Sequence, residues 1–410
     1  MTAPPTAAAP DLEAFRRAAE TLRGVAIETP TLHSEPFSRE LGAPVHLKLE
    51  CLQQTGSFKI RGAFVKLTSL TEEERGRGVI CSSAGNHGQG VALSARRLGV
   101  KATVVMPEDA AYTKARAIRG HGAEVIRVGA SYDDAYRYAR ALCDERGLTF
   151  VHPFDDPAIV AGQGTIGLEI VRAVPEVGTI VCPIGGGGLI SGIALAAKAV
   201  RPQVQVVGVV AAAARATLLA FESGERVDAP VGATIADGIR VKRPGEITFP
   251  IIRAAVDRVV DVTEDELGDA IYGLLDAHRI AAEGAGAAAL AAVLSRKAGG
   301  LAAPVVAVVS GGNIDLNLLT HVIERGLTNA GAYIAFGTRV RDRPGELYRL
   351  LTWLRERKLN ILEIEHRRAG VRMPLGFTEI EVLAEAMDPE HGRDVLTDLK
   401  AAGYEIRLLA

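Results

Sequence analysis

The sequence has few cysteines, few aromatic residues and no long uninterrupted apolar run. Four cysteines occur in 410 residues, none of them in a Cys-x-x-Cys pair, and each lies in or beside an apolar stretch. This pattern predicts reduced, mostly buried thiols in a reducing cytoplasm rather than disulfides or a zinc centre. The alanine-rich stretch 281–293 is interrupted by glutamate and glycine, so we expect no membrane span.

An excess of charge is also missing. The formal net charge is −2, with no basic patch and no polybasic run, so neither nucleic acid nor a membrane surface is an expected partner. Hydrophobic residues make up 48% of the chain, enough for sizeable cores, and the length predicts two or three domains. Residues 1–10 have no basic start and no apolar core, so they predict a disordered tail rather than a signal peptide.

Most of the chain alternates short apolar strands with helical segments. Strand-loop-helix units of about 20 to 25 residues predict a parallel sheet covered by helices. Right-handed connections then make a doubly wound α/β layer the expected architecture. Strands are expected at 44–49, 79–81, 102–106, 124–128, 179–184, 204–210 and 302–310. Helices are expected at 11–23, 91–98, 115–119, 131–146, 164–174, 189–200 and 264–277.

The composition changes near residue 330, and the order of the elements changes with it. The segments that follow predict strand 332–340, helix 346–358, strand 360–366, strand 376–382, helix 392–401 and strand 404–408. This β-α-β-β-α-β order is that of ferredoxin-like domains. We therefore expect a large α/β domain over 11–325 and a separate α+β domain over 330–410.

The stretch Thr55–Ala63 carries a lysine at a junction between polar and apolar residues. Its apolar spacing predicts a helix that begins near Lys59, capped by Ser57 or Thr55. The helix dipole disfavours positive charge at that end, so the Lys59 amine should lose its proton more easily than a surface lysine. Such an amine can form a Schiff base with a carbonyl. The alternative is an ordinary solvated helix lysine.

Four consecutive glycines at 185–188 lie between an expected strand and an expected helix. Free N–H groups at a helix N-terminus bind anions, so we expect a phosphate cradle here, with a flexible turn as the alternative. A Gly-x-Gly-x-x-Gly match at 187–192 lacks an acidic residue about 20 positions later, which makes dinucleotide binding a weak interpretation. The Lys-Ser/Thr of a Walker A loop is missing too.

Two further polar loops follow strands. Ser82–Gly90 offers hydroxyls, an amide and an imidazole, which suit a carboxylate and a ring hydroxyl; His87 alone could equally be a capping or surface residue. Ser310–Asn313 presents a neutral hydroxyl at another strand end. An amine, a carboxylate site, a phosphate cradle and a hydroxyl together predict pyridoxal 5'-phosphate as cofactor.

These motifs resemble those of the threonine dehydratases (threonine ammonia-lyases). The resemblance rests on Ser57–Ala63 (SFKIRGA), Ser83–His87 (SAGNH), the glycines 185–188 with Leu189, and Ser310–Asn313 (SGGN). It implies a fold-type II pyridoxal-phosphate enzyme, tryptophan synthase β-like, with two lobes of parallel or mixed sheets and a small lobe at about 50–150. Arg341–Leu347 (RDRPGEL) resembles the opening of a regulatory ACT domain.

The resemblance also implies roles for single residues. Lys59 would bind the cofactor covalently and then act as the base at the substrate Cα, while Ser310 would face the pyridine nitrogen. A hydroxyl cannot keep that nitrogen protonated, which favours expulsion of the β-hydroxyl over racemisation. The other cofactor contacts implied are Phe58, Asn86, Gly185, Gly186, Gly187, Gly188 and Leu189. The substrate carboxylate contacts implied are Ser83, Ala84, Asn86 and His87, and Glu283 matches a glutamate near the cofactor of relatives.

Two positions depart from related enzymes. Serine racemases carry a second serine where this chain has Ala84, so racemisation should be poor. Relatives with a divalent cation place carboxylates where this chain has Ala211–Ala216, which contains none, so we expect no metal site.

The resemblance implies deamination of L-threonine to 2-oxobutanoate and ammonia, with L-serine a slower substrate. An amino-acid effector, isoleucine or valine, would act through the ACT-like domain, whose alternative role is purely structural. A cytoplasmic homodimer or homotetramer is expected, and both isoleucine biosynthesis and threonine breakdown are compatible. The alternatives are a serine racemase or threonine synthase on the same fold, a catalytically weak amino-acid sensor and, remotely, a dinucleotide oxidoreductase.

Overall fold

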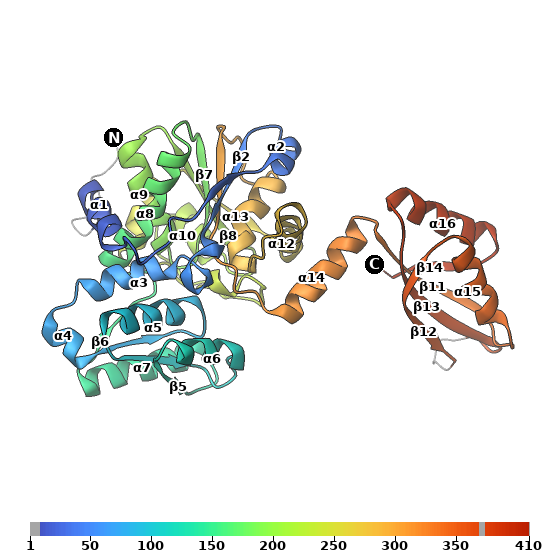
Figure 1. Ribbon diagram of the computed structural model, residues 1–410, viewed down its shortest axis with the longest axis horizontal. Coiled ribbons are helices and arrows are strands. Elements are labelled where there is room, and N and C mark those ends of the chain that lie inside the picture. Colours follow the sequence, from blue (N-terminus) through green and yellow to red (C-terminus); the bar gives the residue numbers. More distant parts are fainter. Residues whose placement is uncertain (1–8, 369–373, 410) are drawn as a thin grey trace. The chain divides into compact units, whose positions relative to one another are not determined.

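The computed structural model describes residues 9–368 and 374–409, and its chain divides into two compact units between Ile314 and Asp315 (Figure 1). Most of the expected tail 1–10 lies outside the described residues. Helix α14 (Leu316–Asn329) groups with the second unit, whereas the sequence assigned most of it to the first. The structural boundary at 314/315 thus precedes the predicted boundary between 325 and 330. The assignment of catalysis to 11–325 and of regulation to 330–410 stays a prediction.

The smaller sheet of the first unit has four parallel strands in the order β5-β4-β3-β6. Side chains alternate between its two faces: Cys81 and Val104 join the core under α5, whereas Ile80 and Val105 join the core under α7. Helices therefore cover both faces, as the doubly wound prediction requires. The strands are β3 (Val79–Ser82), β4 (Ala102–Met106), β5 (Glu124–Arg127) and β6 (Thr149–Phe150). The helices around them are α4 (Glu72–Arg77), α5 (Asn86–Leu98), α6 (Tyr112–Gly120) and α7 (Tyr132–Arg146).

The larger sheet has six strands in the order β1-β2-β10-β7-β8-β9, all parallel except the edge strand β1. Its central strands β7 and β10 are buried on both faces, which explains why their sequences, TIVCP and VVAVV, are almost entirely apolar. The strands are β1 (Thr31–His33), β2 (Val45–Leu49), β7 (Thr179–Pro183), β8 (Gln205–Ala211), β9 (Arg258–Val262) and β10 (Val305–Val309). The helices are α1 (Leu12–Thr21), α2 (Glu35–Leu41), α3 (Lys59–Thr68), α8 (Pro157–Ala173), α9 (Gly188–Val200), α10 (Ala216–Ser223), α11 (Thr248–Ala255), α12 (Glu264–His278) and α13 (Gly284–Leu294).

Helices α5 and α8 begin more than one turn before the predicted residues, and the alanine-rich α13 is among the helices that were not predicted. Helix α5 begins at Asn86 rather than 91, and α8 begins at Pro157 rather than 164. The missed turns contain glycines that resemble loop residues. In the structure these glycines let helices touch: a Cβ at Gly162 would lie 2.6 Å from the Cα of Gly62, and one at Gly90 would lie 3.0 Å from the Lys59 carbonyl carbon. Close helix contact outweighs helix propensity at these positions.

The second unit contains a four-stranded antiparallel sheet in the order β12-β13-β11-β14. Ile380, Val382 and Ala384 alternate toward the core that α15 and α16 complete. The predicted ferredoxin-like order is confirmed. The elements are β11 (Tyr333–Arg341), α15 (Glu346–Glu356), β12 (Asn360–Arg367), β13 (Phe377–Glu385), α16 (Pro389–Ala401) and β14 (Ile406–Leu408).

All four cysteines are buried free thiols, as their apolar surroundings predicted. Within the described residues, no helix is both long and apolar enough to cross a membrane.

Candidate active site

Lys59 is the first residue of α3, where the sequence placed the start of this helix. The expected cap is wrong, because Phe58 precedes the helix and neither Ser57 nor Thr55 caps it. Ser57 is extended and Thr55 has a left-handed backbone with φ of 67°. Both side-chain oxygens are buried without a hydrogen-bond partner among the described residues. The segment before Lys59 is therefore held by contacts other than a helix cap.

Those contacts come from the loop after β10. Residues 55–58 run antiparallel to residues 310–313: the Phe58 N–H donates to the Ser310 carbonyl over 3.2 Å, and Ser57 pairs with Gly311. The Gly312 N–H donates to the Gly56 carbonyl over 2.8 Å. This pairing fixes the lysine beside the Ser310 loop, although more than 200 residues separate the two in the sequence.

The Lys59 amine lies in a largely desolvated position with one protein hydrogen bond among the contacts described. Its Nζ donates to the Pro153 carbonyl over 3.1 Å and lies 5.0 Å from the centre of the Phe58 ring. Burial lowers the pKa of Lys59 to about 8, against the opposing effect of the Glu283 carboxylate. The amine is thus partly neutral near physiological pH, as a nucleophile or base must be.

Ser310 belongs to this paired segment, and Glu283 is attached to it, because the Glu283 N–H donates to the Gly311 carbonyl over 3.1 Å. Burial, and then the charge of Asp237, raise the pKa of Glu283 to about 7, although Asn86 Nδ2 donates to its Oε1 over 2.6 Å. A Cβ at Gly311 would lie 2.1 Å from the same oxygen, so only glycine admits the carboxylate here. Ser310 is buried, and its hydroxyl makes a long contact of 3.4 Å to the Ala285 carbonyl. Ser310 therefore retains hydrogen-bonding capacity.

The loop after β3 opens helix α5, so Asn86 and His87 lie in its first turn. The N–H groups of this turn have no partners within the helix. Ser83 Oγ accepts from the Gly85 N–H over 3.2 Å, and a Cβ at Gly85 would meet nothing within 4 Å, so this end faces open space. Ala84 packs against the small-lobe core.

The imidazole of His87 points into the protein rather than into that space. Its Nε2 donates to the Val151 carbonyl over 3.0 Å, and burial lowers the pKa of His87 to about 3. The ring is therefore neutral, and the main-chain N–H of His87 is the group left for an anion. The His87 side chain is thus a buried core contact and neither a cap nor a surface residue, and the substrate role of His87 stays a prediction.

The glycines 185–188 form the turn from β7 into α9, with Gly187 at a φ of 100° that other residues rarely adopt. Thr217 Oγ1 donates to the Gly185 carbonyl over 3.1 Å, and Thr248 Oγ1 donates to the Gly186 carbonyl over 2.6 Å. Since each peptide is planar and trans, holding these carbonyls on one side turns the following N–H groups to the other. The turn thus presents N–H groups at a helix N-terminus.

The glycine turn and the lysine share a neighbour. A Cβ at Gly186 would lie 2.3 Å from the ring of Phe154, which follows the Pro153 that accepts from Lys59. The predicted site residues of the other three loops follow the carboxyl ends of β3, β7 and β10, where parallel sheets bind ligands. Phe58 and Lys59, at the start of α3, are held beside them by the pairing with residues 310–313.

These residues fit pyridoxal phosphate. A lysine of low pKa, a neutral hydroxyl, an amide and an anion-binding glycine turn match the cofactor's aldehyde, ring nitrogen, ring hydroxyl and phosphate in chemistry. The partnerless buried Ser57 Oγ beside Lys59 is also expected where a bound group completes a site. In the described part of the chain, no group of three or more His, Cys, Asp or Glu side chains is placed to hold a metal ion.

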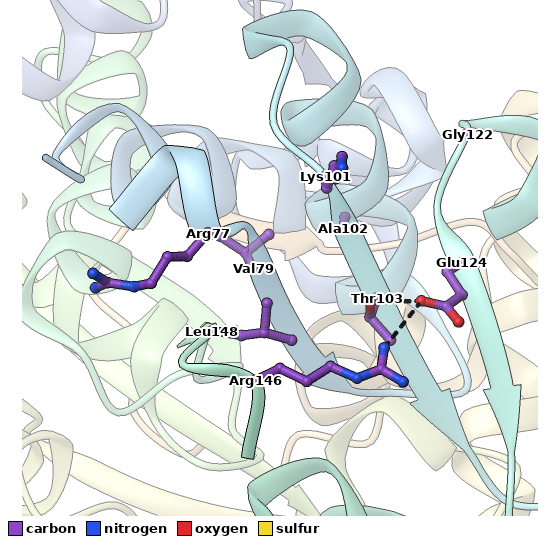
Figure 2. Close-up of a pocket in the computed structure, with 9 residues that line it drawn as sticks. All are labelled: Arg77, Val79, Lys101, Ala102, Thr103, Gly122, Glu124, Arg146 and Leu148. Carbon is purple, nitrogen blue, oxygen red and sulfur yellow. Dashed lines mark hydrogen bonds and ion pairs between the residues drawn. The ribbon is translucent and has the colours of Figure 1, made fainter. Parts of the chain in front are cut away.

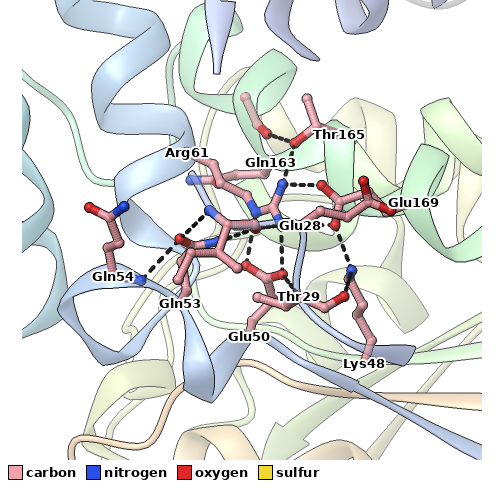
Figure 3. A network of polar contacts seen from close by, with 12 residues as sticks. Glu28, Thr29, Lys48, Glu50, Gln53, Gln54, Arg61, Gln163, Thr165 and Glu169 are labelled. Carbon is pink, nitrogen blue, oxygen red and sulfur yellow. Dashed lines mark hydrogen bonds and ion pairs between the residues drawn. The ribbon is translucent and has the colours of Figure 1, made fainter. Parts of the chain in front are cut away.

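Two residues after the lysine, Arg61 of α3 belongs to a buried ionic cluster (Figure 3). We call this cluster the Arg61 network; its members are Lys48, Glu50, Arg61 and Glu169. Arg61 Nη1 lies 2.6 Å from Glu169 Oε1, and its Nη2 lies 2.8 Å from Glu50 Oε1. Burial alone would raise the pKa of Glu50, but the Arg61 guanidinium holds that pKa below its usual value. The network fixes α3 against β2 and α8.

A pocket of about 390 Å³ lies elsewhere, at the amino ends of β3, β4 and β5 (Figure 2). Arg77 and Lys101 line it, together with Arg146, whose Nη1 lies 3.8 Å from Glu124 Oε2. None of its lining residues was predicted for the site. Because ligands of parallel sheets bind at the opposite edge, this pocket is not the active site.

Several supporting residues escaped the sequence analysis. Phe154 and Thr248 shape the glycine turn, and Pro153 contacts Lys59 through a carbonyl that every residue possesses. No local pattern marks them. Asn313 is different, because it ends the SGGN motif and its side chain contacts Asn86 over 2.7 Å. The asparagine at the end of the SGGN motif was therefore a signal for a polar contact near Ser310.

Residues 22–311 match the family model described as pyridoxal-phosphate dependent enzyme. The chain is 47% identical to an L-threonine ammonia-lyase of Geobacter sulfurreducens over 395 residues, or 96% of this chain and 98% of that relative. It is 44% identical to an L-threonine ammonia-lyase of Thermotoga maritima, over 97% of this chain and 99% of that relative.

Two solved structures are similar in fold as well as in sequence. The processed form of threonine deaminase isoform 2 from Solanum lycopersicum has a TM-score of 0.73 and 36% identity, covering 79% of this chain and 91% of that one. Maize serine racemase has a TM-score of 0.73 and 33% identity, covering 78% of this chain and 99% of that one.

Proposed function

Because this chain belongs to the family of pyridoxal-phosphate-dependent enzymes, we propose that it deaminates L-threonine to 2-oxobutanoate and ammonia. The resemblance to the threonine dehydratases, the fold class and the cofactor expected from the motifs are confirmed. The observation that carries the reaction is Lys59, a buried amine whose pKa of about 8 suits both covalent cofactor attachment and proton abstraction.

When bound, pyridoxal phosphate supplies a carbonyl for amino groups and a conjugated ring that withdraws electrons from the substrate Cα. The N–H groups of Gly185, Gly186, Gly187, Gly188 and Leu189 would hold its phosphate. Asn86, Phe58 and Ser310 would contact its ring. The support is that the glycine turn, the amide, the aromatic ring and the hydroxyl surround one lysine.

The first turn of α5 would hold the substrate carboxylate. Main-chain N–H groups at Asn86 and His87, next to Ser83 and Ala84, lie at a helix N-terminus that favours negative charge. Held there, the amino acid presents its Cα to Lys59 Nζ, which takes the Cα proton. The β-hydroxyl then leaves as water, and hydrolysis of the dehydrated product takes up one water and gives one 2-oxobutanoate and one ammonia.

Ala84 separates this proposal from racemisation. A racemase needs a proton donor on the face of Cα opposite the lysine, and the methyl group of Ala84 offers no proton. Ser310, a neutral hydroxyl, also favours elimination over a long-lived carbanion. A lyase is therefore preferred, even though maize serine racemase shares the fold.

The C-terminal unit would carry the regulation. Its ferredoxin-like order and its RDRPGEL segment are typical of an ACT domain, so we place an isoleucine or valine site within residues 330–410. Such domains also pair with one another, which supports a homodimer or homotetramer. Four buried free thiols support a cytoplasmic location.

The test is 2-oxoacid release by the purified protein with L-threonine and with L-serine, each with and without isoleucine. We expect a yellow protein, faster release from threonine and suppression by isoleucine. Activity that ignores isoleucine removes the effector proposal and keeps the lyase. A colourless protein that releases no 2-oxoacid from either substrate overturns the proposed reaction and favours an amino-acid sensor.

A further inference from the structure

Four polar groups at the site form a continuous chain of hydrogen bonds. The Asn313 amide contacts the Thr55 carbonyl and Asn86 Oδ1, each over 2.7 Å. Asn86 Nδ2 in turn contacts Glu283 Oε1 over 2.6 Å. We call these four groups (Thr55 carbonyl, Asn313, Asn86 and Glu283) the amide chain.

The Thr55 carbonyl determines which group donates and which accepts in every hydrogen bond of the amide chain. A carbonyl only accepts, so Asn313 must turn its Nδ2 toward Thr55. The same Nδ2 faces Asn86, which must therefore present its Oδ1. That choice turns Asn86 Nδ2 toward Glu283, whose Oε1 accepts. Although an amide has two orientations that differ only in which end is nitrogen, this network permits one of them.

The backbone at both ends is shaped to make these contacts. Thr55 has a φ of 67°, a left-handed conformation that is costly for a residue with a branched side chain. The next residue must be glycine, since a Cβ at Gly56 would lie 2.4 Å from Asn313 Oδ1. At the other end, a Cβ at Gly311 would lie 3.3 Å from Asn86 Nδ2 and 2.1 Å from Glu283 Oε1. The left-handed backbone of Thr55 and the missing side chains of Gly56 and Gly311 thus make room for the amides of Asn313 and Asn86.

From this geometry we infer that Asn313 is a positioning residue, which sets the orientation of the Asn86 amide so that Asn86 offers an N–H to the cofactor. Asn86 Nδ2 has two hydrogens, and Glu283 takes one of them. The second is left for a hydrogen-bond acceptor such as the cofactor's ring oxygen. With the amide reversed, Asn86 would offer that acceptor a carbonyl oxygen and repel it. The inference rests on the proposed contact between Asn86 and the cofactor.

Two substitutions of nearly equal volume separate orientation from packing and from charge. Asn313→Asp replaces the donor with an acceptor, and Asn313→Leu removes the donor without adding charge. If Asn313 sets the amide, both weaken pyridoxal-phosphate binding by the full-length chain, Leu by about tenfold and Asp by about a hundredfold, because one or two hydrogen bonds are lost or reversed. Both also shift the visible absorption band of the bound cofactor. The value of kcat falls while KM for threonine changes less than about twofold, since main-chain N–H groups bind the substrate.

A role in packing alone or in charge alone would give a different pattern of binding. If Asn313 only fills space, both variants bind the cofactor normally. If only charge matters, Asp weakens binding and Leu does not. Either pattern overturns the inference. Asn317→Asp adds the same carboxylate at an exposed position in the first turn of α14 and should leave both cofactor affinity and spectrum unchanged.

Two further variants protect the test. If Asn86→Ala leaves cofactor affinity unchanged, the proposed Asn86 contact itself fails; if Asn86→Ala weakens binding and both Asn313 variants do not, only the present inference fails. If Asn313→Asp does not fold, it is combined with Glu283→Gln, whose amide can donate to a reversed Asn86. Recovery of folding in the double variant supports the amide chain. Without recovery, cofactor binding by Asn313→Leu decides the inference, since that variant adds no charge opposite the Thr55 carbonyl.

Discussion

Arg61 and Lys59 are two cationic side chains on α3, two residues apart, and their surroundings are opposite in kind. Arg61 faces two carboxylates, a hydroxyl and a carbonyl, with contacts between 2.6 and 3.1 Å. Among the described residues, Lys59 Nζ has one hydrogen bond, to the Pro153 carbonyl at 3.1 Å, and Glu283 acts on it only through its charge. Both have lost most of their contact with water. They differ in how many protein groups take the place of the lost water as hydrogen-bond partners.

The difference decides which groups keep their charge. Against the opposing effect of burial, the carboxylates of Glu50 and Glu169 raise the pKa of Arg61, and the Arg61 guanidinium lowers that of Glu50, so both groups keep their charge near neutral pH. In contrast, burial without full pairing lowers the pKa of Lys59 to about 8 and raises that of Glu283 to about 7. Groups poised near neutrality can move protons, whereas the paired groups behind them hold the helix in place.

The comparison predicts opposite outcomes for the two residues, and the largest effect is that of Lys59→Ala on activity. Threonine deamination should fall by about a thousandfold or more, because one side chain supplies both the nucleophile and the base. The free energy of unfolding should not fall, since the lost amine was poorly paired. Activity assays and denaturant unfolding measure the two effects. Lys66→Ala on the same helix is the control and should keep activity within about twofold.

Arg61→Met should do the reverse and act on stability. Removing the guanidinium leaves Glu50 and Glu169 buried with Lys48 as the remaining cation of the network, which should lower the free energy of unfolding by about 3–5 kcal/mol. Urea unfolding measures the loss. Arg17→Met on the exposed side of α1 should change stability by less than about 0.5 kcal/mol. A loss at Arg61 no larger than at Arg17 would contradict the distinction between paired and poised charges.

The sequence identified the reactive residues of this comparison but not the contacts that distinguish them. Apolar spacing placed the start of α3 at Lys59, and glycine-rich loops after strands marked the rest of the site. The cap was wrong because the segment before Lys59 pairs with residues 310–313, and pairing across such a separation leaves no local pattern. Sequence spacing can predict a helix, but not its tertiary neighbours.

Glycine explains why the predicted starts of α5 and α8 were too late. Within α5 and α8, glycines such as Gly90 and Gly162 resemble loop residues, yet they lie where two helices touch. The role of Arg61 was also hidden, since its partner Glu169 lies 108 residues away. The sequence offered the His87 imidazole as a carboxylate ligand or as a capping or surface residue, whereas the structure buries the ring against the Val151 carbonyl, a contact that leaves no local pattern.

The pH dependence of stability should reveal Glu283. Its pKa is raised from 4.5 to about 7, so between these values the folded protein holds a proton that the unfolded chain releases. Stability should therefore fall as the pH rises through this window, by about 1–3 kcal/mol in the protein prepared without cofactor. Glu283→Gln should remove this fall. Urea unfolding at several pH values between 4.5 and 7 measures it.

His87 complicates the measurement and supplies its internal check. Burial lowers the pKa of His87 from 6.5 to about 3, so its contribution runs the other way, and stability is lost as the pH falls below 6.5. Subtracting the Glu283→Gln profile from that of the parent protein cancels the histidine. A difference that stays flat from pH 4.5 to 7 would show that Glu283 titrates normally.

The smallest loss of stability should come from breaking an exposed ion pair. Lys242 Nζ contacts Asp133 of α7, and more than half of each side chain is exposed. Lys242→Ala should therefore lower the free energy of unfolding by less than about 1 kcal/mol. The loss should disappear when unfolding is measured in about 1 M salt rather than at low ionic strength. Because this pair joins the two lobes as the Arg61 network joins helix and sheet, it isolates the effect of burial. If Lys242→Ala costs as much as Arg61→Met, burial does not set the strength of these ion pairs, and the contrast between Arg61 and Lys59 must be explained by the missing partners of Lys59 alone.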